Sequence, residues 1–223
     1  MSNVKLTPGQ RSQLLHDMHT FCVNPHTREI FLHSYVDSET EEEPGVEYRT
    51  AITLEKNISL LNRLNDKPII IHMHSPGGDW NDGMAIYDAI KCSKCHVTIL
   101  AYAHASSMSS IILQAADLRL LLPNTEVLIH FGEISLNTTS IGAKSFMKVN
   151  QQNNSTMLEI YTSKCKDGQF FQNKTKAQIK QFLHTHMQRA QDWYLTSHEA
   201  VEYGFADYVI GGDKYPTIAS CTE

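Results

Sequence analysis

The clearest indication of the fold comes from one segment of the sequence, Pro68-Ile69-Ile70-Ile71-His72-Met73-His74-Ser75-Pro76-Gly77-Gly78. Its first half is short, apolar and β-branched, and turn residues close it, which predicts a buried strand over 68–73. Apolar residues at helical spacing follow directly and predict a helix over 81–91. A strand, a glycine turn and a helix in this order form the repeating unit of an α/β domain.

The same alternation extends to both sides of this stretch. Further strands are predicted over 29–32, 97–102, 126–129 and 207–210, and further helices over 48–64, 107–116 and 197–205. The short links between these elements favour one α/β domain with mostly parallel pairing. Residues 141–187 are helix-prone and polar, with a break at Lys166-Asp167-Gly168, so a long helix and a shorter one are expected to project from the core.

Composition limits the possible functions. The chain has 223 residues, 41% of them hydrophobic, and a formal net charge of -5, which fits one substantial core. Basic residues are neither in excess nor clustered, so no nucleic-acid partner is expected. No stretch reaches the length of a membrane span, and residues 1–21 lack the apolar core of a secretory signal, which favours a cytoplasmic protein.

Residues 1–27 are predicted to be a variable N-terminal segment, with one short amphipathic turn at Leu14, Leu15 and Met18.

The five cysteines do not predict a disulfide scaffold, because their number is odd and their spacing is sparse. The run Cys92-Ser93-Lys94-Cys95-His96 matches the pattern of covalent haem attachment. Haem attachment requires an exported chain, and this run lies between a predicted helix and a predicted strand, where a turn is expected. A two-thiol metal site would lack a second pair of ligands. The sequence therefore predicts no cofactor and no metal.

Three short runs contain the residue types of acyl-transfer chemistry. In Ala105-Ser106-Ser107-Met108 a serine lies at a strand-to-helix junction, where free N–H groups favour negative charge, although a helix cap explains it better on this run alone. Paired glycines at Gly77-Gly78 allow a ligand to approach the backbone, or simply make a tight turn. His130 follows an apolar strand, and Asp192 precedes Trp193-Tyr194-Leu195. Function often resides at such element ends, but each run alone is also compatible with a structural role.

Together with their surroundings, these runs resemble the ClpP family of serine proteases, in the Clp/crotonase superfamily. The matching blocks occur in family order over most of residues 28–210: Arg28 to Leu32, His74 to Gly78, Gly83 to Ile90, Ala105 to Met108, Leu122 to Asn124, Ile129-His130 and Asp192 to Asp207. The resemblance implies an α/β spiral of repeated ββα units with a protruding helical handle at about 141–187. It places the protease domain at 28–223.

The resemblance also implies a role for each candidate residue. Ser107 would be the nucleophile, His130 the general base and Asp192 the residue that orients the histidine, with the backbone N–H groups of Gly78 and Met108 as the oxyanion hole. This set implies a serine endopeptidase that cleaves peptides or unfolded proteins through an acyl-enzyme intermediate. Two strands, after Gly78 and after His130, are expected to hold the extended substrate.

The family further implies a homo-oligomeric ring, a heptamer or a double heptamer, and an AAA+ unfoldase as a possible partner. Two other functions are compatible with the fold. A crotonase-type acyl-CoA enzyme would share the fold without needing this triad, and a catalytically silent ring subunit would usually lack one triad member.

Several positions depart from the family pattern. Phe131-Gly132 replaces the usual Gln-Pro pair. Gln191 stands where an arginine often pairs two rings, and Glu133 to Gly142 poorly keeps the family's glycine-rich segment, so weaker ring stacking is expected. Ile70 and His72 occupy the positions of the aromatic pocket that receives an unfoldase. The acidic stretch 37–45 is predicted to be an inserted, solvated loop.

Overall fold

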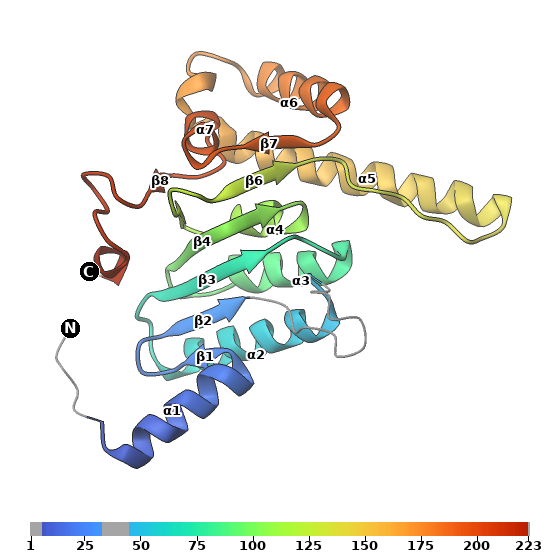
Figure 1. The fold of residues 1–223 in the computed structure, drawn as a ribbon. Helices are drawn as coiled ribbons and strands as arrows, with labels where there is room; N and C mark the ends of the chain where they lie inside the picture. The colour runs from blue at the N-terminus through green and yellow to red at the C-terminus, as the bar shows by residue number, and fades with distance from the viewer. Residues whose placement is uncertain (1–5, 33–44, 223) are drawn as a thin grey trace.

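The computed structural model describes residues 6–32 and 45–222 (Figure 1). The strands are β1 (Val23–Asn24), β2 (Glu29–Leu32), β3 (Ile69–Ser75), β4 (Val97–Ser106), β5 (Leu118–Leu121), β6 (Glu126–Ile129), β7 (Trp193–Leu195) and β8 (Tyr208–Val209). The helices are α1 (Pro8–Phe21), α2 (Tyr48–Leu64), α3 (Trp80–Lys91), α4 (Met108–Leu113), α5 (Ser140–Cys165), α6 (Lys176–Ala190) and α7 (Ser197–Tyr203), with two 3-10 turns, η1 (Gln169–Phe171) and η2 (Ile218–Thr222).

One mixed sheet organises the described part of the chain, with strand order β1-β2-β3-β4-β5-β8. The pairs from β2 to β8 are parallel, while β1 pairs antiparallel with β2. Helices α2, α3 and α4 lie behind the sheet in Figure 1 and cover one of its faces. Short links between strands and covering helices explain the parallel pairing. The strand–helix alternation confirms the predicted α/β class.

The isoleucine run of β3 lies at the centre of the core. Ile69, Ile71 and Met73 are fully buried on the face that the helices cover. Ile86 on α3 and Leu61 on α2 are also fully buried in the same cluster. An apolar β-branched strand buried in this way is typical of a parallel sheet, and it confirms the buried strand that the sequence predicts over 68–73.

Strand β4 is longer than predicted and joins two parts of the sheet. Its first half pairs with β5, at Thr98 to Ala101, and its second half pairs with β6, at His104 to Ser106. The predicted strand over 97–102 therefore continues to Ser106, because β6 provides the missing partner. β5 and β7 were not expected from the sequence, and among the described strands β7 pairs only with β6.

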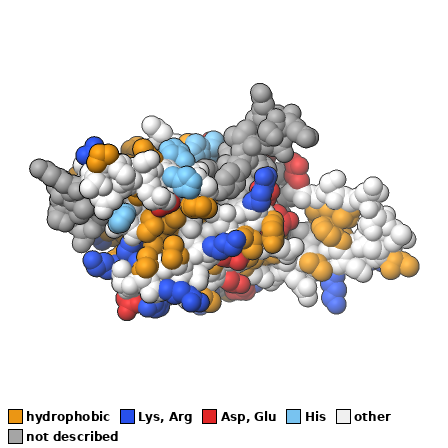
Figure 2. Space-filling view, turned by 90° about the horizontal axis from the view of Figure 1, so that it is seen from below, with side chains coloured by type: hydrophobic (Ala, Val, Ile, Leu, Met, Phe, Trp, Pro, Cys, Tyr) orange, Lys and Arg blue, Asp and Glu red, His pale blue; other side chains and the backbone are white. Residues whose placement is uncertain are grey.

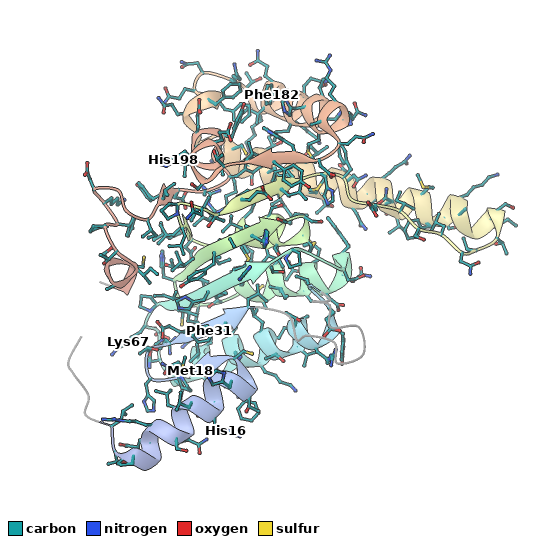
Figure 3. All side chains as sticks on the ribbon, in the orientation of Figure 1. His16, Met18, Phe31, Lys67, Phe182 and His198 are labelled. Carbon is teal, nitrogen blue, oxygen red and sulfur yellow. The ribbon has the colours of Figure 1, made fainter. Side chains whose placement is uncertain are left out.

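The long helical segment after β6 divides into two helices with different surroundings. Helix α5 has 26 residues, and its first part projects from the body of the protein (Figure 1). Helix α6 packs back against the body, where Ile179, Leu183 and Met187 are buried. Phe182 of α6 joins an aromatic cluster with Trp193 and other rings (Figure 3). The projecting part is thus shorter than the predicted span 141–187.

The N-terminal segment forms a full helix rather than one short turn. Helix α1 has 14 residues, and a capping box at Thr7 together with Pro8 in the first turn explains where it begins. The predicted turn lies within this helix but is wrong as to length, and none of the helix residues is fully buried. His16 and Met18 are labelled on the helix in Figure 3. The domain division at residue 27 stays a prediction, and the acidic stretch lies, except for Gly45, outside the described residues.

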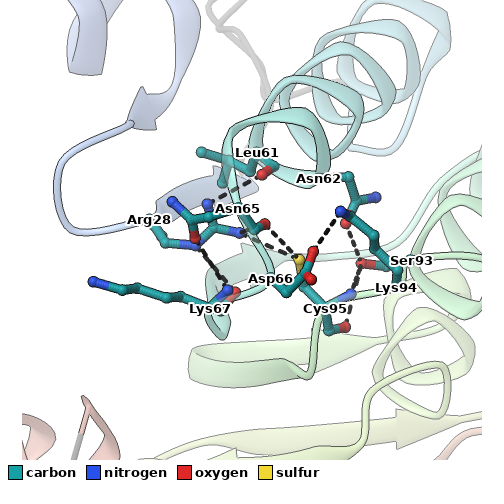
Figure 4. A network of polar contacts seen from close by, with 9 residues as sticks. All are labelled: Arg28, Leu61, Asn62, Asn65, Asp66, Lys67, Ser93, Lys94 and Cys95. Atoms are coloured by element: carbon teal, nitrogen blue, oxygen red, sulfur yellow. Dashed lines mark hydrogen bonds and ion pairs between the residues drawn. The ribbon is translucent and has the colours of Figure 1, made fainter.

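The cysteine-rich run forms the turn between α3 and β4, as predicted. Cys95 is buried, and its Sγ lies 3.3 Å from a guanidinium nitrogen of Arg28 and 3.4 Å from the carbonyl oxygen of Asn65 (Figure 4). The Arg28 guanidinium also donates to the Leu61 carbonyl near the end of α2, where a cation is favourable. This network ties the α2 terminus to the start of β4. Cys92, Cys95, Cys165 and Cys221 are free thiols.

Candidate active site

Three side chains from distant parts of the chain form one hydrogen-bonded series. Ser107 Oγ lies 2.7 Å from His130 Nε2, and His130 Nδ1 lies 2.9 Å from Asp192 Oδ1. Ser107 follows β4, His130 follows β6, and Asp192 precedes β7. The pairings of β4 with β6 and of β6 with β7 bring the three residues together. These are the three residues that the sequence singled out.

The hydrogen bonds determine the histidine tautomer. A carboxylate only accepts hydrogen bonds, so Nδ1 of His130 donates to Asp192. In the neutral ring Nε2 then carries a lone pair, which accepts from the Ser107 hydroxyl. The His130 side chain is 19% exposed and that of Asp192 is 55% exposed, so the acid end of the series is open to solvent while the centre is enclosed.

The backbone at Ser107 is in an unusual conformation. Its φ is 52° and its ψ is -122°, outside the regions that non-glycine residues prefer. Strain of this kind costs about 1–3 kcal/mol and persists where the surroundings enforce it. Ser107 occupies the N-cap of α4, yet its side chain makes no capping hydrogen bond. The helix-cap interpretation therefore does not account for the hydroxyl, which is directed to His130 instead.

The N–H groups of Gly78 and Met108 are both free of main-chain partners in the described part of the chain. Gly78 forms a parallel bridge with Val46, in which the Gly77 carbonyl and the Asp79 N–H make the hydrogen bonds. The Gly78 N–H therefore lies outside this bridge. Met108 begins α4, and the first N–H groups of a helix have no intrahelical acceptor. Both groups are thus available to an anionic oxygen.

Close packing around Gly77 holds the glycine turn against the serine turn. A Cβ at Gly77 would lie 2.7 Å from Ser107 Cβ and 2.9 Å from Met108 N. A Cβ at Gly83 on α3 would likewise overlap the Met108 side chain. Sequence reasoning assigned Gly77 to a tight turn or to the approach of a ligand, and it gave Gly83 no role of its own. A glycine inside a helical pattern was the available signal for Gly83, since it often marks a close approach.

Two further contacts link the same turns. Ser109 Oγ lies 2.8 Å from Ser75 Oγ, which in turn accepts from the Gly77 N–H at 3.3 Å. Gln191 immediately before Asp192 has a φ of 59° and ends α6, so a sharp change of direction precedes the carboxylate. These residues contact the candidate site without belonging to the hydrogen-bonded series.

The expected pair of substrate-binding strands is not present as predicted. The chain enters α3 at Trp80, two residues after Gly78. Residues 130–137, which follow β6, form no regular secondary structure. The first expectation is wrong because Asp79 caps α3 with its side chain, which starts the helix at once.

Other kinds of site have less support in the described residues. Across 6–32 and 45–222, no group of three or more His, Cys, Asp and Glu side chains is arranged to hold a metal ion. Within the same ranges, no helix combines the length and the apolar character that a membrane crossing requires. The observed chemistry is that of a hydroxyl, an imidazole and a carboxylate in series.

A mixed α/β fold with repeated strand–helix units and a Ser–His–Asp series is typical of the Clp/crotonase proteases. The chain belongs to the Clp protease family, whose model matches residues 26–213. It is 31% identical over 153 residues to the ATP-dependent Clp protease proteolytic subunit 2 of Prochlorococcus marinus (strain MIT 9312), covering 66% of this chain and 67% of that protein. It is 30% identical over 172 residues to the ATP-dependent Clp protease proteolytic subunit of Deinococcus radiodurans, covering 74% and 76%.

Proposed function

We propose that this chain is a serine endopeptidase that cleaves peptides or unfolded proteins through Ser107, His130 and Asp192. The observation that carries the proposal is the continuous series from Ser107 Oγ through both ring nitrogens of His130 to Asp192, with links of 2.7 and 2.9 Å. A serine that only capped α4 would direct its hydroxyl to the helix N–H groups. Membership of the Clp protease family supports the same class of reaction.

In the proposed reaction, His130 Nε2 takes the proton of the Ser107 hydroxyl as its oxygen attacks the peptide carbonyl carbon. Asp192 holds the tautomer and stabilises the imidazolium that forms. The N–H groups of Gly78 and Met108 donate to the oxyanion. The imidazolium then gives its proton to the leaving amine, and water hydrolyses the acyl-enzyme by the reverse sequence.

Assembly into a homo-oligomeric ring, a heptamer or a double heptamer, is the second part of the proposal. Large apolar side chains are exposed on the projecting part of α5, where Figure 2 shows a group of hydrophobic atoms. They include Ile141 (78% exposed) and Val149 (51% exposed). An exposed apolar area of this kind favours protein–protein contact. Native mass spectrometry that found only monomers would contradict the ring.

An AAA+ unfoldase is the proposed partner of the ring. The relatives are named ATP-dependent proteolytic subunits, which supports this partner.

Labelling with a fluorophosphonate probe tests the proposed activity. The probe should modify wild-type protein at Ser107, and Ser107→Ala should lose both labelling and peptide turnover, by about a millionfold for turnover. Ser106→Ala is the matched control, because it removes the neighbouring hydroxyl, and it should still be labelled. Labelling that persists in Ser107→Ala would place the nucleophile elsewhere.

Two alternative functions give different results in the same experiment. A catalytically silent ring subunit would assemble without labelling. A crotonase-type enzyme would bind a coenzyme A affinity matrix and would hydrolyse no peptide.

A further inference from the structure

A buried pair of hydroxyl groups, those of Ser110 and Tyr161, is hydrogen-bonded to the backbone of Ser107 through Ser110. Ser110 Oγ lies 2.6 Å from the Ser107 carbonyl oxygen and 2.7 Å from the hydroxyl oxygen of Tyr161. Both side chains are fully buried, Ser110 on α4 and Tyr161 on the inner part of α5. Neither residue belongs to the Ser107–His130–Asp192 series, and sequence reasoning singled out neither.

The direction of these hydrogen bonds follows from the chemistry of the groups. A carbonyl oxygen can only accept, so the Ser110 hydroxyl donates to Ser107. Its single proton is then used, and the Tyr161 hydroxyl must donate to Ser110. Burial raises the pKa of Tyr161, so this hydroxyl retains the proton that it needs to donate. The result is a chain of two hydrogen bonds, in which Tyr161 donates to Ser110 and Ser110 donates to the Ser107 carbonyl oxygen. We call this chain of hydrogen bonds the relay.

The relay acts on the same peptide group that carries the Met108 N–H. A trans peptide is planar, so the direction of the Ser107 carbonyl fixes the direction of the Met108 N–H on the opposite side. The Ser107 carbonyl also accepts from the Ser110 N–H at 3.0 Å, and the Ser107 N–H donates to the Leu128 carbonyl at 2.9 Å. The strained peptide at φ 52° is therefore held on both sides.

We propose that Tyr161 and Ser110 are positioning residues that aim and polarise the Met108 N–H toward the oxyanion of the reaction. Hydrogen bonds in series polarise one another, so a donor to the carbonyl strengthens the N–H of the same peptide as a donor. The N–H would then be preorganised for the charge that develops in the transition state. This inference rests on the proposed serine-peptidase function and adds two residues outside the Ser107–His130–Asp192 series, which act through the main chain of Ser107.

The test compares Ser110→Ala and Tyr161→Phe with wild-type protein in its assembled form. Because the relay acts on a transition-state contact, kcat should fall about tenfold in Ser110→Ala and about threefold in Tyr161→Phe, with KM unchanged. Complete loss of an oxyanion donor costs about 100-fold or more, which sets the upper limit. The inhibition constant of a peptide boronate, which places an oxygen where the oxyanion forms, should rise by the same factor as kcat falls. Ser110→Thr retains a hydroxyl and should restore part of the rate.

Thr162→Val is the matched control. Thr162 is adjacent to Tyr161 on α5 and buried, and its hydroxyl has no hydrogen-bond partner among the described residues. Its removal should leave kcat and boronate affinity unchanged. Equal losses in Thr162→Val and Tyr161→Phe, or a folded Ser110→Ala protein with wild-type kcat and boronate affinity, would overturn the relay. If the wild-type protein is not labelled by a fluorophosphonate, the proposed function itself fails, which is a distinct result.

Discussion

Replacing Gly77 by alanine should damage the site much more than the size of one methyl group suggests. Gly77 has a φ of 105°, which an L-residue rarely adopts. Its added Cβ would lie 2.7 Å from both the Ser106 carbonyl oxygen and Ser107 Cβ, and 2.9 Å from Met108 N. These neighbours form the strained serine turn, and two of the three atoms belong to the backbone, which cannot rotate away.

The expected cost has two parts. The unfavourable φ costs about 1–3 kcal/mol, and overpacking costs about 1–3 kcal/mol more. To restore an ordinary contact of 3.4 Å, an atom at 2.7 Å must retreat by 0.7 Å, since 3.4 - 2.7 = 0.7. Displacement on the order of 1 Å in an active site can reduce the rate about 100-fold. Gly77→Ala should therefore lose about 2–6 kcal/mol of stability together with a large part of its labelling rate.

Gly211→Ala separates the two parts of the cost. Gly211 has a similar φ of 99°, but a Cβ there meets nothing within 4 Å. This variant should lose only the backbone part, about 1–3 kcal/mol, and keep its labelling rate. Urea unfolding midpoints and fluorophosphonate labelling rates of the two variants give the comparison. If Gly77→Ala is no less stable than Gly211→Ala and is labelled at the same rate, the close packing of the two turns is refuted.

Two further predictions concern charged groups outside the site. The Arg119 side chain is 6% exposed and pairs with Asp207, so Asp207→Asn should cost about 3–5 kcal/mol in urea unfolding by leaving a buried charge without its partner; an unchanged midpoint would contradict this. The pKa of Glu29 lies below its ordinary value of 4.5 because the His72 ring, whose Nε2 lies 3.5 Å from Glu29 Oε1, favours the charged carboxylate. The stability that this contact contributes is present above about pH 4.5 and is lost as the pH falls through the lower folded-state pKa. In thermal unfolding, the advantage of wild type over Glu29→Gln should therefore shrink on acidification, and a constant difference would refute it.

The main features of the fold were predictable because they depend on local patterns. The isoleucine run and the helical spacing after it identify β3 and α3 without any knowledge of the tertiary structure. The short strands β5 and β7 were not predictable in the same way. β7 has three residues, and its pairing with β6 over a separation of more than 60 residues decides its conformation. Tertiary context outweighs propensity in segments of this length.

The residue types of the site could be predicted, but not the groups that hold them. Ser107, His130 and Asp192 stand in runs that can be recognised in sequence. Tyr161 is 51 residues away from Ser110, and nothing in a polar helical segment indicates that its hydroxyl reaches α4. The predicted amphipathic turn in 1–27 failed for a related reason: the cap at Thr7 starts a full helix even though α1 buries no side chain.

The uneven pairing of the strands gives the three candidate residues very different anchorage. Within 6–32 and 45–222, β4 pairs with β3, β5 and β6, whereas β7 pairs with β6 alone. Segments with few pairings open locally at lower free energy than central strands do. Amide hydrogens near Ser107 should thus exchange with solvent slowly and those near Asp192 much faster. A thermal fluctuation near β7 can break the Asp192–His130 hydrogen bond while the segment at Ser107 stays folded. The series of three side chains can therefore be interrupted and restored reversibly.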